Sequence, residues 1–536
     1  MKKLWQALTM VRRCDPGSFW RKVLYVMLQS VLPLVNLFIL KMLVDSVEAG
    51  VHGAGSMQQA LQLLLLMVAV FLANRVVSAL NSVNNDVLSQ RLVDYLSDVM
   101  QRQASRLDMA YYDNPEYHDS LHRAQQEASF RPIQIMNNFM ALFGSLLSIS
   151  GIVAMLTAAS WWVIVVMIAA VMPGFGLRMY KARRIYRFRR DNTQLYRQTA
   201  YYSALLTARD YAKEMRAFNL TAFFRQRFVE SRSLLVKQLL RISRRIGVLD
   251  VLCGVIEAVA MFAVVWLLVA QAFAAAITIG SFVMLFEAFR RGQGYLTTLV
   301  GSVAALYDNR LFVGNLFDFL SFKPQILSPA NPVPVPERIE TVEFRDVTFR
   351  YPDMETDVLD HYNLTARVGE VTRIKGENGY GKSTLVKLLL RLYDPQQGAV
   401  LVNGVDIRRF NLDELRSKVG VLFQDFVRYN LTAAENIGFD RADGVRQAAE
   451  QAVADKFIDR LPRGYDNMLG RVFDGGAELS MGQWQRVAIA RMLHTSAPVM
   501  VLDEPMAWMD MPTRELFTQT IDRIAKDKII IMISHA

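Results

Sequence analysis

Six apolar segments in the first 300 residues restrict the fold of this chain more than any other feature. They lie near residues 19–43, 58–82, 136–157, 160–180, 247–271 and 277–300. Each is long enough to cross a bilayer, which takes about 20 residues in a helix. The chain has 536 residues, of which 52% are hydrophobic, a share between those of soluble and pure membrane proteins. We therefore predict an α-helical six-span transmembrane domain over residues 1–322, with long cytoplasmic helical extensions, followed by a soluble half.

The distribution of positive charge predicts the orientation in the membrane. Residues 178–245 hold 18 Lys and Arg against four acids, whereas the net charge of the whole chain is +11. The short connections at 44–57 and 272–276 contain no Lys or Arg. Because loops rich in Lys and Arg stay in the cytoplasm, we expect a multi-pass protein of the cytoplasmic membrane with both termini in the cytoplasm. The alternative interpretation of the basic run at 178–245 is a solvated helical face or a nucleic-acid patch. The apolar spans on both sides of the run argue against it, so no nucleic-acid partner is expected.

The remaining composition excludes several site types. Cys14 and Cys253 lie far apart without a CxxC pair, so neither a disulfide framework nor a zinc site is indicated. The apolar stretch 4–11 is short and lacks a cleavage site, and we interpret it as an interfacial helix instead of a signal peptide. Five prolines between residues 324 and 336 predict an extended linker over 323–340. Strand-like and helical runs then alternate over 341–536, which predicts an α/β domain.

A phosphate-binding loop lies in this second half. Residues 376–384 read G-E-N-G-Y-G-K-S-T and fit the pattern G-x-x-x-x-G-K-[ST]. Its backbone N–H groups can surround phosphate oxygens, its lysine can reach the β- and γ-phosphates, and its serine can ligate Mg²⁺. The candidate nucleotide-binding residues of this loop are Gly376, Asn378, Gly379, Tyr380, Gly381, Lys382, Ser383 and Thr384.

Two acids follow an apolar strand downstream. Residues 499–504 read V-M-V-L-D-E, and a strand apolar on both faces suits a parallel sheet. Asp503 can hold Mg²⁺ and Glu504 can polarise the attacking water. The structural alternative is an acidic turn, which the phosphate loop upstream disfavours. Gln424 lies between the two motifs and can contact the metal or the water.

Three further groups complete the candidate site. Tyr351 ends the predicted strand 347–351 and lies 25 residues before the phosphate loop. Its ring can stack on adenine, although a tyrosine in this position alone is more often an ordinary strand aromatic. His535 follows an apolar run and can donate a hydrogen bond to the γ-phosphate. Residues 479–483 precede a predicted helix whose N-terminal N–H groups can face an anion. The candidates in this segment are Ser480, Gly482 and Gln483.

In this order the motifs resemble the nucleotide-binding domain of an ATP-binding cassette (ABC) transporter. The six-span domain is similar to the exporter type, in which each half-transporter carries its own membrane domain. The resemblance implies an α/β P-loop domain with a helical subdomain that binds ATP and Mg²⁺ and hydrolyses ATP. It implies that Tyr351 stacks adenine, Gln424 senses the γ-phosphate, Glu504 is the catalytic carboxylate and His535 is the switch histidine.

The resemblance also implies a second half-transporter as partner, because the signature at 479–483 serves the nucleotide held by the other subunit. Residues 111–116 and 212–218 resemble coupling-helix regions. Residues 423–426 and 482–485 are similar to bacterial peptide-associated exporters. We therefore expect ATP-driven export of a peptide, lipid or amphipathic small molecule by alternating access, as half of a homodimer or heterodimer.

Three departures from the family's pattern leave a second function open. The signature has Met481 where the family has glycine, and residues 506–510 read M-A-W-M-D instead of the usual D-loop. The chain ends one residue after His535, where relatives continue, so we expect a truncated chain or a missing edge of the domain. These departures favour a slow-ATPase or regulatory subunit of a heterodimeric transporter, whereas intact Lys382 and Glu504 oppose it.

Ionisable residues inside the predicted spans have two open interpretations. Such groups are costly at membrane depth and usually face a cavity or a partner. They therefore either line a substrate cavity or pair internally, as Glu287 can with an arginine one turn away. The residues are Glu257, Glu287, Arg290 and Arg291.

Overall fold

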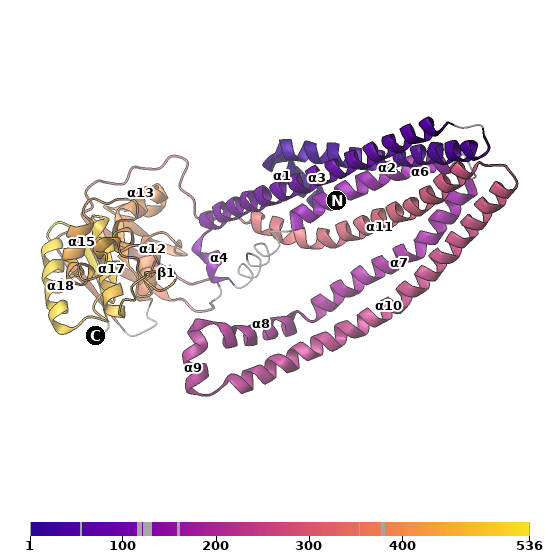
Figure 1. Cartoon of the computed structure of the whole chain (residues 1–536). Coiled ribbons are helices and arrows are strands. Elements are labelled where there is room, and N and C mark those ends of the chain that lie inside the picture. The colour runs from indigo at the N-terminus through magenta and orange to yellow at the C-terminus, as the bar shows by residue number, and fades with distance from the viewer. Residues whose placement is uncertain are drawn as a thin grey trace. The chain divides into compact units, whose positions relative to one another are not determined.

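The computed structural model describes residues 2–53, 56–114, 121, 131–157, 161–352, 354–376 and 381–534. Contacts within the chain divide it into two compact units (Figure 1). Unit 1 comprises Met1–Ala104 and Asp119–Ser321, and unit 2 comprises Ser105–His118 and Phe322–Ala536. A short segment from the first long connection between spans thus belongs with the second unit, which the sequence alone did not indicate.

The described part of unit 1 is helical. Its helices are α1 (Lys2–Cys14), α2 (Pro16–Val51), α3 (Met57–Arg106, whose last two residues belong to unit 2), α6 (Arg131–Thr157), α7 (Trp161–Asp191), α8 (Thr193–Thr207), α9 (Ala212–Ala217), α10 (Thr221–Phe273) and α11 (Ile279–Ser321). Helices α7 and α10 run side by side, and α10 also packs on α8 (Figure 1). As predicted, the spans continue as long helices beyond their apolar parts.

Five of these helices are long and apolar enough to cross a membrane: α2, α3, α6, α7 and α10. They cover the first five spans expected from the sequence. The sixth expected span lies in α11, which carries three charged side chains in its apolar part and does not meet the same measure within the described residues. A six-span count therefore stays a prediction.

The three charged residues in the apolar part of α11 are paired with one another. Arg290 Nη2 lies 2.9 Å from Glu287 Oε2, and Arg291 Nε lies 3.7 Å from the same oxygen. Arg291 Nη1 also donates to the carbonyl of Pro33 in α2, at 3.3 Å. Internal pairing lowers the cost of these charges within a membrane helix. Their role in a substrate path stays a prediction.

Unit 2 contains two sheets in its described residues. The strands are β1 (Thr341–Phe349), β2 (Leu359–Arg367), β3 (Val371–Lys375), β4 (Gln397–Val402), β5 (Val405–Asp406), β6 (Val419–Leu422), β7 (Val499–Asp503) and β8 (Ile529–Ser534). The first sheet has the order β2-β1-β4-β5 and is antiparallel; the second has the order β3-β8-β7-β6 and is parallel. All five residues of β7 are buried, which confirms the expected strand with apolar neighbours on both faces.

Helices surround these sheets. They are α12 (Lys382–Leu389), α13 (Leu412–Ser417), α14 (Ala433–Gly438), α15 (Val445–Gln451), α16 (Asp455–Ile458), α17 (Met481–His494) and α18 (Met511–Ile524), together with the short α4 (Met109–Asp113). Residues from α14 to α17 form one apolar core with β7, β8 and α18. A second core lies between the first sheet, α12 and the other face of the parallel sheet. The expected α/β domain with a helical portion is therefore observed.

Candidate nucleotide-binding site

The phosphate-binding loop connects β3 to α12. Gly381 is the N-cap of α12 with φ +71°, a left-handed conformation that glycine adopts at little cost. A Cβ at this position would lie 2.8 Å from Leu359 Cδ2 and 2.9 Å from the carbonyl oxygen of Val358. Glycine is therefore required for two reasons, the left-handed backbone conformation and the lack of space for a side chain. Lys382 Nζ donates to the carbonyl of Gly376 at 2.8 Å, which holds the ammonium beside the residue that begins the loop.

Three of the candidate residues in this loop lie outside the described residues. They are Asn378, Gly379 and Tyr380, and His535 is outside them as well. Their predicted roles stay predictions.

The first metal candidate is a contact between α12 and β7. Ser383 Oγ donates to Asp503 Oδ2 at 2.7 Å, and Asp503 is buried at the carboxyl end of β7. A hydroxyl and a carboxylate oxygen are the hard ligands that Mg²⁺ prefers, and Mg²⁺ takes its other ligands from water and substrate phosphates. Among the described residues no cluster of three His, Cys, Asp or Glu could hold a metal alone. The donor set therefore fits an ion brought together with a nucleotide.

The second pair joins the two residues expected next to the reacting water. Gln424, which follows β6, donates from Nε2 to Glu504 Oε1 at 3.0 Å. Glu504 has φ +50°, an uncommon conformation for a residue with a side chain. Its N–H donates to the carbonyl of Ile533 at 3.0 Å. A strained residue in a site is held there by its surroundings, and here the neighbouring strand supplies the bond.

Gln485 is a site residue that the sequence reasoning missed. It lies on α17 and is buried, and its Nε2 donates to the carbonyl of Glu504 at 3.0 Å. Its Oε1 accepts from the N–H of Trp508 at 3.2 Å. One amide thus fixes both the backbone of Glu504 and the segment after it. The only signal in the sequence was a polar residue within an otherwise apolar helix face.

Tyr351 lies beside the same loop. The strand predicted to end at this residue ends two residues earlier, at Phe349, because the ladder with β2 stops there. The Tyr351 hydroxyl is 3.1 Å from Thr384 Oγ1, and its ring packs edge-to-face on Phe349, with centroids 4.9 Å apart. Lys387 Nζ lies 5.0 Å from the ring centre. These three contacts fix the orientation of the Tyr351 ring. Its stacking on adenine stays a prediction.

These residues border one cavity of about 400 Å³, a size that suits a small-molecule ligand. It brings together both acids, Gln424, the end of the phosphate loop and Tyr351. Its lining comprises Tyr351, Met354, Val358, Gly381, Lys382, Ser383, Thr384, Gln424, Asp503 and Glu504.

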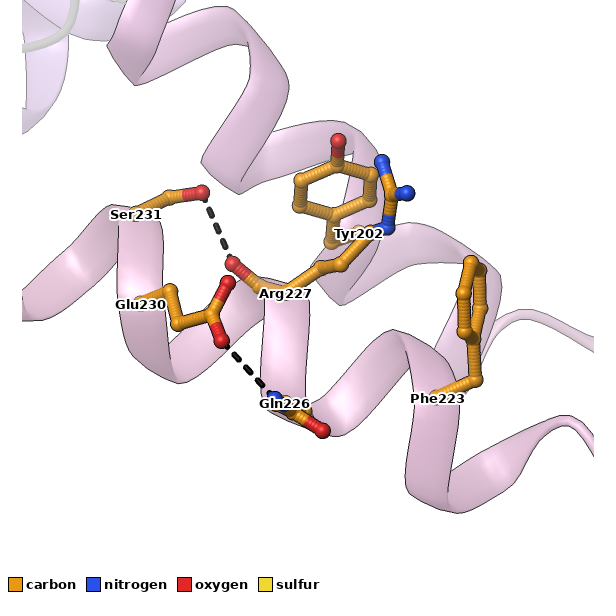
Figure 2. A pocket seen from close by; sticks show the side chains of 6 residues that line it. All are labelled: Tyr202, Phe223, Gln226, Arg227, Glu230 and Ser231. Carbon is orange, nitrogen blue, oxygen red and sulfur yellow. Dashed lines mark hydrogen bonds between the residues drawn. The ribbon is translucent and has the colours of Figure 1, made fainter.

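A second hollow, of about 490 Å³, is formed by α8 and α10 in unit 1 (Figure 2). Its polar groups bond along α10: Gln226 donates to Glu230 at 2.9 Å, and Ser231 donates to the carbonyl of Arg227 at 2.7 Å. The Arg227 guanidinium lies 4.7 Å from the centre of the Phe223 ring. None of the sequence motifs lies there, so the first cavity is the candidate site.

The signature segment does not line this cavity; it begins α17. Ser480 and Gln483 form a capping box: the Ser480 hydroxyl accepts from the N–H of Gln483, and the Gln483 side chain accepts from the N–H of Ser480. A Cβ on Gly482 would lie 2.4 Å from the carbonyl oxygen of Trp508. Met481, by contrast, is 38% exposed, and Arg428 Nη1 lies 3.7 Å from its sulfur.

Of the segments expected to be coupling-helix regions, 111–116 overlaps α4 and 212–218 contains α9; residues 115 and 116 lie outside the described residues. Helix α4 lies in unit 2, where Ala110 packs against the apolar core. The Asp108 carboxylate accepts from the N–H groups of Gln325 and Ile326, and the Tyr111 hydroxyl donates to the carbonyl of Lys323 at 3.0 Å. The start of the predicted linker is therefore fastened to α4.

Comparisons with known proteins show what the chain is similar to. Residues 359–507 match the family described as "ABC transporter". The chain is 26% identical to the subtilin transport ATP-binding protein SpaT of Bacillus subtilis, over 100% of this chain and 88% of that protein. It is 26% identical to the nisin transport ATP-binding protein NisT of Lactococcus lactis, over 94% and 84%. It is also 31% identical to an ATP-dependent lipid A-core flippase of Chromohalobacter salexigens, over 70% and 64%.

A solved structure has the same fold. It is a bacterial Atm1-family ABC exporter with ATP bound, with a TM-score of 0.76, 23% sequence identity, and coverage of 98% of this chain and 91% of that one. The expected exporter architecture is therefore confirmed for this integral membrane protein. The chain belongs to the ABC transporters, as an exporter-type half-transporter whose helical membrane domain is fused to an ATP-binding domain.

Proposed function

We propose that the chain hydrolyses Mg²⁺–ATP and uses the energy to export an amphipathic substrate across the cytoplasmic membrane by alternating access, as half of a dimer. The observation that carries this proposal is the convergence of two contacts on one cavity: Ser383 with Asp503, and Gln424 with Glu504. The oxygens of the first pair would hold Mg²⁺, which neutralises charge on the phosphates. The second pair would orient and polarise the water that attacks the γ-phosphate.

Three groups of this chain would bind the nucleotide. Lys382 would move its ammonium from the carbonyl of Gly376 to the phosphates, which are stronger partners because they are charged. The start of α12 would present its N–H groups to the same anion. Tyr351 would receive the base on its ring. The signature at Ser480 would serve the nucleotide of a partner subunit, so a complete site needs two chains.

The class of substrate is proposed from the relatives. The two that span nearly the whole chain are named for subtilin and nisin transport, and both compounds are peptides. A lipid, as for the flippases, and an amphipathic small molecule are the other candidates. Stimulation of ATP hydrolysis by nisin, with a phospholipid vesicle and a small amphipathic dye as the competing probes, would separate these classes.

Replacing the carboxylate tests the proposed activity. Glu504→Gln keeps the shape and the contact with Gln424 but removes the charge that polarises water. Loss of a general base costs about 10²–10⁴-fold, so turnover of the purified full-length chain should fall at least about a hundredfold while ATP still binds. Gln485→Glu is a poor control because that amide is buried; Glu478→Gln, on the exposed segment before the signature, is the matched one. Near-normal hydrolysis by Glu504→Gln would remove this residue from the mechanism.

A slow-ATPase or regulatory subunit is the second candidate. Met481 is the observation that favours it. Its partly exposed thioether side chain lies at a position of the signature where the family has glycine, which presents only backbone atoms. The capping box and the close approach of Gly482 to Trp508 are both retained, which favours an active signature. Turnover by the chain alone, at a rate that rises with the square of its concentration at low concentration, would support an active homodimer. No turnover without a second half-transporter would support the regulatory alternative.

A further inference from the structure

Tyr393 connects the proposed base-binding ring to helix α4. Its ring packs edge-to-face on Tyr351, with centroids 5.3 Å apart and planes at 85°, and on Phe349 at 5.6 Å. Lys387 Nζ lies 5.8 Å from the centre of the same ring. The side chain is 4% exposed, so it has no room to reorient without moving one of these neighbours.

The other end of Tyr393 reaches α4. Its hydroxyl donates a hydrogen bond to the Asp113 carboxylate, at the last residue of α4. Burial, and then Asp113 itself, raise the pKa of Tyr393 above its ordinary value, so the hydroxyl keeps its proton and stays a donor at neutral pH. A charge-assisted hydrogen bond of this kind is stronger than one between neutral groups.

The second attachment of α4 does not involve the nucleotide site. It joins Asp108 and Tyr111 to the backbone of residues 323–326. One end of this five-residue helix is thus fastened to the linker, and the other end is fastened to an aromatic ring that contacts Tyr351. A change in the position of Tyr351 would alter only the attachment through Tyr393 and Asp113.

We propose that Tyr393 is a positioning residue that makes the order of α4 depend on whether a base is stacked on Tyr351. The proposal rests on the proposed function, because it assumes that ATP occupies the cavity. Tyr351 and Tyr393 form the first contact of this route, and Tyr393 and Asp113 form the second. Phosphate binding alone engages the loop and Ser383 without requiring the ring of Tyr351. A base stacked on Tyr351 contacts that ring directly. Helix α4 therefore responds to the nucleoside and not only to the phosphates.

Hydrogen exchange on the full-length chain tests this proposal, with two probes. Mg²⁺–ATP supplies base and phosphates, whereas Mg²⁺–tripolyphosphate supplies phosphates alone; both are used at saturation, established by competition with labelled ATP. The readout is backbone exchange of residues 108–114. We expect ATP to slow this exchange at least about fivefold more than tripolyphosphate, the lower range of ordinary couplings between sites.

Tyr393→Phe keeps the ring and removes the bond to Asp113, so the difference between the two probes should disappear while ATP affinity stays within about twofold. Tyr111→Phe is the matched control, since it removes a hydroxyl bond from the same helix without touching the base route, and it should keep the difference. If Tyr393→Phe folds poorly, Asp113→Ala removes the same bond from the other side.

Equal protection of α4 by both probes in the parent chain would overturn the proposal. So would a difference that survives in Tyr393→Phe or Asp113→Ala. ATP hydrolysis by the parent chain is measured in the same preparation: its absence would count against the proposed function, whereas hydrolysis without base-dependent protection of α4 would count against this inference alone.

Discussion

Gly482→Ala should damage the site although it adds only one methyl group. The added Cβ would lie 2.4 Å from the Trp508 carbonyl oxygen, whereas real Cβ atoms essentially never come within 3.0 Å of another atom. One side must therefore move by about 0.6 Å, the difference between these two distances. Neither side is a flexible side chain: Gly482 follows the capping residue Ser480, and the backbone of Trp508 is bound by Gln485.

The same displacement reaches Glu504, the proposed catalytic carboxylate. Gln485 bonds both Trp508 and the carbonyl of Glu504, so moving the first shifts the second. Overpacking of this kind costs about 1–3 kcal/mol. In a domain of 150–250 residues this lowers Tm by roughly 2–12 °C. We expect Gly482→Ala also to lower ATP turnover at least about tenfold, since a misplacement near 1 Å in a site can cost about a hundredfold.

Thermal unfolding and ATP turnover are measured on the purified chain, with Met481→Ala as the matched control. Met481 is the adjacent residue, already carries a Cβ and is exposed, so its truncation should change stability by no more than about 0.5 kcal/mol. A Gly482→Ala variant with unchanged Tm and turnover would refute the reasoning. Equal destabilisation by the two substitutions would refute it as well.

Four other outcomes are expected. Lys382→Ala removes a cation from the phosphates, so ATP affinity in a binding titration should fall at least about tenfold, the loss of one charge-assisted bond; unchanged affinity would contradict the assignment. Met481→Gly should raise turnover of the chain alone several-fold if a homodimer forms both sites, and no change would mean that methionine is tolerated. Glu287→Gln should change nisin-stimulated but not basal turnover if this residue lines a substrate path, whereas loss of expression would favour a purely structural pair. The hydrogen bond to Asp346 raises the pKa of His361, so its stabilisation is complete below about pH 6.5 and is lost as pH rises through the raised pKa; Tm should fall more between pH 6 and 8 in the parent than in His361→Gln, and parallel curves would contradict this.

The phosphate loop and the acids were predictable because their chemistry restricts residue types at fixed spacing. A run such as 499–504 can be interpreted from its apolar character alone, and the structure places it at the centre of the parallel sheet. The alternation of strands and helices over residues 341–536 and the helix after the signature were likewise predicted correctly in type. Boundaries were less predictable: β1 ends at Phe349 and not at Tyr351, since strand ends depend on the neighbouring ladder and not on local propensity.

Contacts between distant segments were not predictable. Gln485 and Tyr393 are separated from their partners by 19 and 280 residues. Gln485 is marked only as a polar residue on an apolar helix face, which does not identify its partners, and nothing in the local sequence distinguishes Tyr393 from other buried aromatic side chains. Tyr393 in particular suits an ordinary core position after α12. Its connection to Asp113 depends on α4 belonging to unit 2, which is a property of the fold and not of any motif.

Met481 shows how a motif departure and a structural requirement can differ. The family's pattern has glycine at position 481, and glycine is required wherever another backbone comes too close for a Cβ. Within this subunit that requirement applies to Gly482, whose Cβ would meet Trp508, and not to position 481, whose side chain extends to the surface beside Arg428. Any impairment by Met481 must therefore arise from contacts with a partner's nucleotide. The guanidinium next to its sulfur adds a positive charge to the surface that would face those phosphates, which works against the steric cost of the thioether. If the steric cost of the Met481 thioether is larger than the gain from the Arg428 charge, the signature is weakened; if the two are equal, its activity is preserved. ATP turnover by the dimer depends on both effects and therefore measures their balance.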